Sequence, residues 1–406
     1  MLQGDPGDVI AALAKRTNAA AVYWNRAYEP WAVEQEALIA ARLEAHGVEA
    51  RSFGGSLLNE PEDLVSGKGQ PYTVFSAYWR AARQRVVHDP LAPPTLSLLD
   101  TSGLGDRLDD WNLRPTQPNW ASRWQKFWQP GEYGAEARLD AFVTDAIHGY
   151  AELRNRPDRA HTSRLSPHLH WGETTPRQIL ARIARAGIPN APDVDKFLSE
   201  IGWREFAYHV LYHHPQFADQ HWRKGFEAFP YRTDPDALRA WQQGRTGYPM
   251  VDAGMRQLWQ TGWMHNRARM AAASFLVKHL RIDWRVGEAW FWDTLVDADL
   301  ANNAMGWQWV AGSGTDAAPY FRIFNPVTQG QKFDPAGVYI RRWCPELAQL
   351  PDGDIHAPFD APPTVLLAAG VELGVTYPWP IVAHKPARDA ALAGFEAVKR
   401  ANAKQR

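Results

Sequence analysis

The segment from Trp263 to Trp309 concentrates side chains whose types and spacing could perform chemistry. It contains the runs Trp263-Met264-His265-Asn266-Arg267-Ala268-Arg269-Met270, Asp297-Ala298-Asp299-Leu300-Ala301-Asn302-Asn303 and Trp307-Gln308-Trp309. An ordinary helical domain would bury apolar side chains here, and buried polar groups cost free energy unless they are paired. Either these polar groups satisfy one another, or they bind something large, polar and aromatic from outside the chain. The second alternative indicates a cofactor site.

The spacing within this segment predicts which side chains point the same way. Asn266, Arg269 and Met270 are spaced i, i+3 and i+4, which places them on one face of a helix. Asp297 and Asp299 are two residues apart, so they cannot share a helix face, and we expect them at a helix end.

Further along, Asn303 and Trp307 follow Asp299 at steps of four residues, so a helix there would direct all three toward one pocket. A neighbouring cationic set is either a solvated basic face or a patch that follows a phosphate backbone. Its members are Arg267, Lys278, His279, Arg281 and Arg285.

A second constellation, Thr162-Ser163-Arg164-Leu165-Ser166-Pro167, precedes a predicted helix start near Pro176. Hydroxyl and free backbone N–H groups at a helix start can hold an anion, although the same residues form ordinary helix caps. Tyr150 and Arg154 lie four residues apart on the preceding predicted helix. They could add a hydroxyl group and a cation to a phosphate site, or they could simply face solvent.

A third constellation is Glu200, Trp203 and Arg204, again spaced i, i+3 and i+4. It is either a stacking indole flanked by an anion and a cation, or a surface ion pair beside a core tryptophan.

Composition and motif searches exclude several classes of protein. The sequence has no P-loop, no G-x-S-x-G, no H-E-x-x-H and no His/Cys spacing typical of a metal site. The single cysteine, Cys344, excludes an internal disulfide framework and fits a reducing compartment, so we expect a cytoplasmic protein. The sequence has no run of 18 or more apolar residues, so no membrane-spanning helix is predicted. The 44 Lys and Arg balance 45 Asp and Glu, but a nucleic-acid binder need be basic only locally.

The elements that must position these residues fall into two predicted domains. Helices near 9–16 and 30–46 alternate with strands near 19–24 and 48–53, a pattern typical of a parallel sheet with crossover helices. Two strands leave edges and a face uncovered, so we expect a truncated Rossmann-like domain over residues 1–95, with a part missing before Met1.

Residues 96–130 are rich in proline, glycine and polar residues, with interspersed indoles that would tether this linker to a surface. The expected fold class is therefore α+β, with a large all-helical domain over residues 131–406. Its predicted helices lie near 133–154, 175–186, 193–212, 235–243, 251–261, 263–281, 287–297 and 344–350, and an alanine-rich helix follows Pro362.

Taken together, these segments resemble the photolyase/cryptochrome family, and specifically the class I DNA photolyases that repair cyclobutane pyrimidine dimers. The resemblance covers nearly the whole chain. The motifs that carry it, besides those quoted above, are Trp203-Arg204-Glu205-Phe206, Gly247-Tyr248-Pro249, Thr261-Gly262-Trp263 and Gly314-Thr315-Asp316-Ala317-Ala318-Pro319-Tyr320-Phe321-Arg322-Ile323-Phe324-Asn325-Pro326.

The resemblance implies a folded FAD held by the helical domain. Asn303 would face flavin N5, and Arg269 would pair with Asp297, in keeping with the need of a buried carboxylate for a cation. The implied FAD-binding residues are Tyr150, Thr162, Ser163, Arg164, Leu165, Ser166, Arg204, Asn266, Arg269, Asp297, Asp299 and Asn303.

The resemblance also implies that the partner is UV-damaged DNA, from which the dimer flips out to reach the flavin. Trp203 and Trp309 would stack on the dimer. Glu200, Asn266 and Met270 would touch its edges, and Arg154, Arg267 and Gln329 would hold the DNA backbone.

An indole relay that reduces the flavin in light is implied as well. Trp307 and Trp284 match its first two positions, but the outer position carries Tyr231, which must lose a proton when it is oxidised. The motif Tyr28-Glu29-Pro30-Trp31 lacks the Asn-Glu pair of folate-antenna members, so the antenna chromophore, of folate or deazaflavin type, is left unassigned.

The favoured hypothesis is a light-driven DNA repair lyase that acts as a monomer, in association with the nucleoid in a bacterium. The rival is a cryptochrome-like photosensor, and a third hypothesis is a flavin protein inactivated by a missing N-terminal region. Met270 and Asn303 favour repair, and Met270 stands where a lyase for (6-4) photoproducts would need a histidine.

Overall fold

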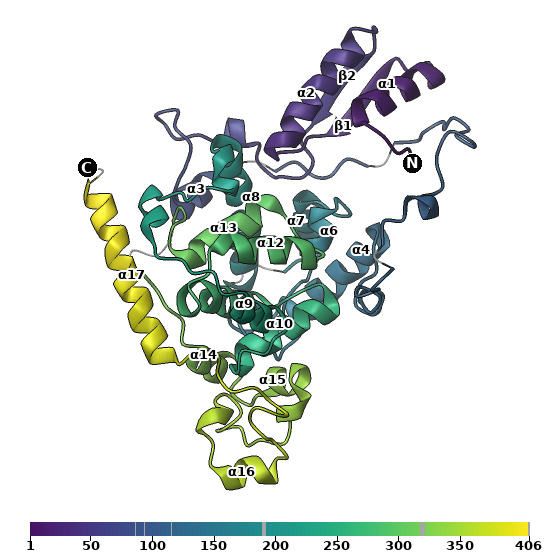
Figure 1. Ribbon diagram of the computed structural model, residues 1–406. Helices are drawn as coiled ribbons and strands as arrows, with labels where there is room; N and C mark the ends of the chain where they lie inside the picture. The colour runs from purple at the N-terminus through teal and green to yellow at the C-terminus, as the bar shows by residue number, and fades with distance from the viewer. Residues whose placement is uncertain (86, 93, 115, 189–191, 317–320, 405–406) are drawn as a thin grey trace.

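The computed structural model describes residues 1–85, 87–92, 94–114, 116–188, 192–316 and 321–404. A small α/β unit at the N-terminus projects from one end of a larger helical body, and α15 and α16 lie at the opposite end (Figure 1). Residues 317–320 of the motif that begins at Gly314 fall outside the described residues.

The N-terminal unit follows the predicted alternation. Its elements are α1 (Pro6–Thr17), β1 (Ala21–Asn25), α2 (Pro30–Glu44) and β2 (Glu49–Phe53). The strands pair in parallel from Ala21 opposite Glu49 to Asn25 opposite Phe53. Among the described residues the sheet has these two strands, and α1 and α2 pack on it through Ala14, Ile39 and Leu43.

A helix that the sequence did not predict, α3 (Phe75–Ala82), belongs to the packing of the helical body. Tyr78 and Ala82 are buried in one cluster with Leu57, Phe206 and Leu211. The chain between residues 57 and 82 therefore packs against α8, although it lies on the N-terminal side of the predicted linker.

The linker indoles anchor the long connection to the helical body, as predicted. Trp124 and Trp128 donate their indole N–H groups to the carbonyl oxygens of Trp259 and Thr261, at 3.2 and 2.7 Å. Trp120 stacks on Trp259, with ring centroids 5.2 Å apart.

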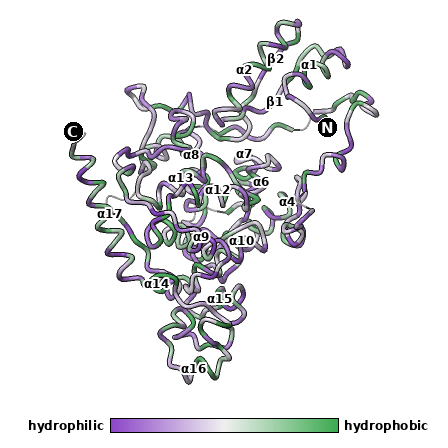
Figure 2. The backbone as a smooth tube through the Cα atoms, in the orientation of Figure 1, coloured by the Kyte–Doolittle hydropathy of each residue, from purple (hydrophilic) through white to green (hydrophobic). Residues whose placement is uncertain are grey.

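The helical body runs from α4 to α17. Its helices are α4 (Glu132–Ala141), α5 (Tyr150–Leu153), α6 (Ser166–His170), α7 (Pro176–Arg185), α8 (Pro192–His213), α9 (Pro235–Gln242), α10 (Pro249–Thr261), α11 (Asn266–Ser274), α12 (Trp284–Thr294), α13 (Leu300–Ala311), α14 (Pro326–Phe333), α15 (Val338–Trp343), α16 (Pro363–Ala368) and α17 (His384–Lys404). Hydrophilic and hydrophobic residues alternate along α17 (Figure 2), which packs against the body through Val398.

Several predicted helices need correction. The single helix near 133–154 is interrupted by a π-helical turn, Phe142–Ala146, and by Gly149, whose φ of 81° a helix cannot continue. The helix near 263–281 begins at Asn266, because His265 caps it, and ends in a π-helical turn, Phe275–His279. The helix near 344–350 is only a 3-10 turn, Pro345–Leu347.

Four further helices, α6, α13, α14 and α15, were not assigned as such, and α12 begins three residues before the predicted 287–297. A capping side chain sets the start of α12, α13 and α14: Asp283 accepts from Arg285 N–H, Asp299 from Asn302 N–H and Asn325 from Val327 N–H.

The main core lies beneath the predicted site segment. Its largest fully buried rings include Trp241, Trp284, Tyr248 and Phe275. Gly287 lets α12 approach α13 closely, because a Cβ atom there would lie 2.2 Å from the Trp307 ring. Among the described helices, none is both long and apolar enough to cross a membrane.

Candidate functional site

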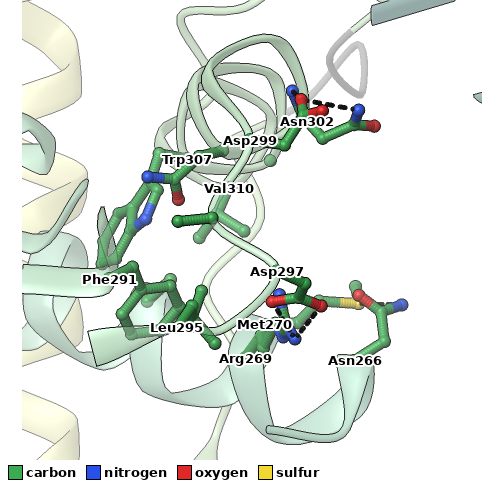
Figure 3. A pocket seen from close by; sticks show the side chains of 14 residues that line it. Asn266, Arg269, Met270, Phe291, Leu295, Asp297, Asp299, Asn302, Trp307 and Val310 are labelled. Atoms are coloured by element: carbon green, nitrogen blue, oxygen red, sulfur yellow. Dashed lines mark hydrogen bonds and ion pairs between the residues drawn. The ribbon is translucent and has the colours of Figure 1, made fainter. Parts of the chain in front are cut away.

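Two adjoining cavities, of about 240 and 340 Å³, lie between α5, α6, α8, α11 and α13. They have five lining residues in common: Asn266, Arg269, Asp297, Asp299 and Asn302. Together they fall within the size range of cofactor sites. Trp307, Phe291, Leu295 and Val310 form an apolar wall of the smaller cavity, and the polar side chains lie opposite (Figure 3).

Asp297 and Arg269 form the expected ion pair at the junction of the two cavities. The Arg269 guanidinium donates to both carboxylate oxygens, at 2.9 and 3.1 Å, and Ser166 Oγ donates to Asp297 at 2.6 Å. The Asp297 side chain is only 3% exposed. Three elements, α6, α11 and the α12–α13 loop, are thereby joined at one carboxylate.

Asp299 both caps a helix and lines the cavities. Its carboxylate caps α13 by accepting from Asn302 N–H at 2.8 Å, and it also accepts from the Tyr208 hydroxyl group. Burial raises its pKa, but hydrogen bonding by His170, the charge of Arg204 and these donors outweigh it and lower the pKa to about 2. Asp299 therefore carries a fixed negative charge beside the cavity at neutral pH.

The Thr162–Ser166 segment forms one wall of the larger cavity, together with Tyr150. Arg164 adopts a left-handed backbone conformation with a φ of 51°, which is uncommon for residues other than Gly, Asn and Asp. Its guanidinium lies 4.8 Å from the centre of the Trp263 ring. The turn thus places hydroxyl groups and backbone at the cavity edge, as an anion cradle requires.

Asn303 and Trp307 line the smaller cavity together, as their spacing predicted. The Asn303 amide nitrogen donates to the backbone and side-chain oxygens of Glu288, at 3.1 and 2.8 Å. Burial raises the pKa of Glu288, and the hydrogen bond from Asn303 opposes that rise. Glu288 thereby fixes the orientation of the amide, so its carbonyl oxygen is the end available to a ligand.

Trp203 lines the larger cavity and stacks on Phe75 of α3, with ring centroids 3.7 Å apart and planes 11° apart. Glu200, on the same face of α8, forms ion pairs with Arg154 at 2.7 Å and Lys196 at 2.8 Å. The third constellation is therefore a cavity wall, and its indole is supported from behind by a ring from the N-terminal half of the chain. Arg204, on the same wall, donates to the Ser56 carbonyl oxygen at 2.7 Å.

Asn266 and Met270 border the cavities from α11. Arg267 is held away from them, because it donates to Asn155 Oδ1 at 2.9 and 2.6 Å and lies over the Phe333 ring. Burial lowers the pKa of Arg267, and the charge of Arg154 adds to that effect.

Five expected site residues lie outside the linings of both cavities: Arg267, Trp309, Gln329, Trp284 and Tyr231. Trp309 is two positions from Trp307 on α13, so the two indoles leave the helix on different sides. Trp284 is completely buried in the core cluster that contains Trp307, and the half-buried Tyr231 packs against that cluster.

The predicted cationic set needs correction. Lys278 and His279 are buried, so they belong neither to a solvated basic face nor to a phosphate-following patch. Lys278 packs over the Phe321 ring, and burial lowers its pKa well below the usual value. His279 contacts His384 of α17, with ring nitrogens 2.8 Å apart. Both residues lie in the π-helical turn of residues 275–279, all of whose residues are buried.

Sequence reasoning missed the residues that hold the site from outside. Phe75, Asn155, Tyr208 and Glu288 come from distant parts of the chain, and no local pattern links them to their partners. Gln308 could have been noticed as the polar residue between two indoles in Trp307-Gln308-Trp309. Its buried amide hydrogen-bonds the loop before Trp222 and so holds that loop against α13.

The donor set suits FAD. A carboxylate–guanidinium pair, hydroxyl groups at a turn, an orientated amide and an apolar indole wall offer partners for hydroxyl groups, phosphates and a planar polar ring. The described residues contain no group of three side chains that could hold a metal ion.

Comparisons with known proteins give matches over both the N-terminal and the helical part of the chain. A family model described as "FAD binding domain of DNA photolyase" matches residues 197–397, and one described as "DNA photolyase" matches residues 1–95. A deoxyribodipyrimidine photo-lyase of Agrobacterium fabrum is 48% identical over 405 residues, 98% of this chain and 84% of the relative. Cryptochrome-1 of Arabidopsis thaliana is 39% identical over 92% of this chain and 57% of its own length.

A solved structure is similar throughout. The crystal structure of a bacterial class III photolyase from Agrobacterium tumefaciens superposes with a TM-score of 0.94 at 48% identity, covering 98% of this chain and 83% of that chain.

Proposed function

This chain belongs to the DNA photolyase/cryptochrome family, and from that premise we propose that it uses light to split cyclobutane pyrimidine dimers in DNA. It is a photo-lyase, and its cofactor is FAD. One observation carries the proposal: two adjoining cavities bring the Asp297–Arg269 pair together with Trp203 and Met270. A polar cofactor and an apolar lesion can therefore meet in one place.

The chain's own residues would hold FAD by polar contacts. Ser166 and Arg269 neutralise and orient Asp297, while Asp299 stays charged beside the larger cavity. Tyr150, Thr162, Ser163 and Leu165 would face the phosphates and the ribityl chain. When bound and reduced, FAD supplies a light-driven donor of one electron to the dimer. Glu288 would hold the Asn303 amide in one orientation toward the flavin ring.

The lesion would enter between Trp203 and α11. Trp203 offers an indole face already braced by Phe75, and base–aromatic stacking of this kind needs no reorganisation. Glu200, Asn266 and Met270 would meet its polar and apolar edges. A pyrimidine dimer stacks poorly in duplex DNA, so flipping it out costs less than flipping an intact base.

We also propose that Trp307, Trp284 and Tyr231 restore the reduced cofactor in light. Trp307 lies in the cavity wall, Trp284 is completely buried in the same core cluster, and Tyr231 packs against that cluster. We propose that residues 1–95 form an antenna-type domain, residues 96–130 a linker and residues 131–406 the catalytic domain. The protein would act as a monomer on DNA in the cytoplasm, at the nucleoid. Class I stays a sequence prediction, because a solved relative is described as class III.

The decisive experiment measures light-dependent loss of thymine dimers from an oligonucleotide after chemical reduction of the bound FAD. We expect blue light to restore intact thymines and darkness to leave the dimers unchanged. An otherwise identical oligonucleotide that carries a (6-4) photoproduct tests the choice of lesion.

The photosensor alternative predicts a different result. It requires a protein that binds FAD and photoreduces it, yet leaves dimers intact even when the cofactor is fully reduced. That result would refute the repair proposal while sparing the assignment of the cofactor.

A further inference from the structure

We propose that His221 is the proton acceptor of oxidised Trp284, so that electron loss from this indole is coupled to transfer of its Nε1 proton to His221 Nδ1. This inference rests on the proposed relay through Trp307 and Trp284. It assigns a role to a residue that lies outside both cavities.

The geometry of the pair defines which nitrogen is the base. Trp284 Nε1 lies 3.3 Å from His221 Nδ1, and both side chains are buried, Trp284 completely and His221 with 4% exposure. An indole N–H can only donate, so His221 Nδ1 must be unprotonated in this contact. The neutral ring therefore carries its proton on Nε2, a buried nitrogen with no hydrogen-bond partner within the described chain.

The loop that carries His221 is fixed in place on both sides. Gln308 of α13 donates to the carbonyl oxygens of Phe217 and Gln220 and accepts from Trp222 N–H. Arg285, from the first turn of α12, donates to the Asp219 carbonyl oxygen at 2.6 Å. The imidazole is thus held against Trp284 rather than free to reorient.

The charges around the imidazole favour a neutral base at neutral pH. Burial lowers the pKa of His221 below its usual value of 6.5, and Arg285 lowers it further, against the opposing charges of Glu227 and Asp283. Tyr231 lies parallel to the imidazole, with ring centroids 6.1 Å apart and planes 3° apart. The Arg285 guanidinium also lies 5.4 Å from the centre of the Trp284 ring, and its charge disfavours a positive charge on the oxidised indole.

The proposed step balances as follows. In the FAD-loaded protein, Trp284 would give one electron to Trp307 after Trp307 had lost one to bound oxidised FAD, which would supply the light-driven acceptor. Trp284 Nε1–H breaks, a bond from His221 Nδ1 to that proton forms, and the products are a neutral indolyl radical and an imidazolium. The electron cannot return until the proton does, so the charge-separated state is prolonged and the flavin stays reduced.

The test is transient absorption of the oxidised, FAD-loaded protein after a blue flash, because cationic and neutral indole radicals absorb differently. Wild type is compared with His221→Gln, whose amide oxygen can accept the indole hydrogen bond but not its proton. We expect the neutral indolyl signal to be lost in H221Q and the cation signal to decay faster by recombination. In wild type the neutral signal should be constant near neutral pH and fall as acid protonates His221.

His214→Gln is the matched control, because His214 is a half-buried histidine that packs against a different indole, Trp222, with ring centroids 4.7 Å apart. It should behave as wild type. Trp284→Phe tests the relay itself. If W284F photoreduces as wild type does, the relay and this inference both fail. If W284F blocks photoreduction but H221Q shows the wild-type ratio of neutral to cationic radical, the relay stands and the role of His221 is refuted.

Discussion

Replacement of Arg269 by methionine should destabilise the protein by leaving Asp297 buried without its cation. Arg269→Met removes two hydrogen bonds to the carboxylate and one from Arg269 Nε to the Met264 carbonyl oxygen. Breaking a fully buried pair costs about 3–5 kcal/mol. Arg269 is 25% exposed, so water can partly replace it, and Ser166 still donates to Asp297. We therefore expect a loss of about 2–3 kcal/mol in the free energy of unfolding.

The assay is urea unfolding at a fixed excess of FAD, since a ligand that binds only the folded state adds to its stability. The control is the double variant Arg269→Met/Asp297→Asn, in which the uncompensated charge is gone. It should recover most of the loss and stay about 1 kcal/mol below wild type, the worth of the Met264 hydrogen bond. If R269M unfolds within about 0.5 kcal/mol of wild type, or the double variant recovers nothing, the pairing does not stabilise the fold as argued.

Three further predictions address the substrate, the relay and pH. Trp203→Ala should weaken binding to dimer-containing DNA by about 1–3 kcal/mol in a filter or anisotropy assay, with a much smaller change on undamaged duplex, and equal losses on both would make Trp203 a core residue only. Trp307→Phe should block photoreduction of oxidised FAD yet leave repair by chemically reduced enzyme intact. Tyr231→Phe should shorten the lifetime of the charge-separated state, and photoreduction that matches wild type in this variant would refute Tyr231 as the terminal donor. Burial raises the pKa of Glu205 from 4.5 to about 7 against the charge of Arg204, so its folded state binds a proton more tightly than the unfolded state. The free energy of unfolding should therefore fall as pH rises from 4.5 to 7, and Glu205→Gln should flatten that part of a pH series of urea unfolding curves, whereas an unchanged slope would refute the burial argument.

The sequence by itself determined the features that depend on local spacing. The β1–α2–β2 alternation, α7, α8 and α10 follow from short-range periodicity and turn residues. The family resemblance also implied that Arg269 pairs with Asp297, in keeping with the need of a buried carboxylate for a cation.

Tertiary structure decided how those residues are supported and which way they face. Phe75 behind Trp203, Asn155 on Arg267 and Glu288 on Asn303 are contacts between elements, and helical periodicity carries no information on them. Lys278, whose charge favoured a surface position, is buried within the π-helical turn of residues 275–279. The same holds for His221 and Trp284, 63 residues apart, because only the packing of a clamped loop against α12 brings a base to an indole nitrogen.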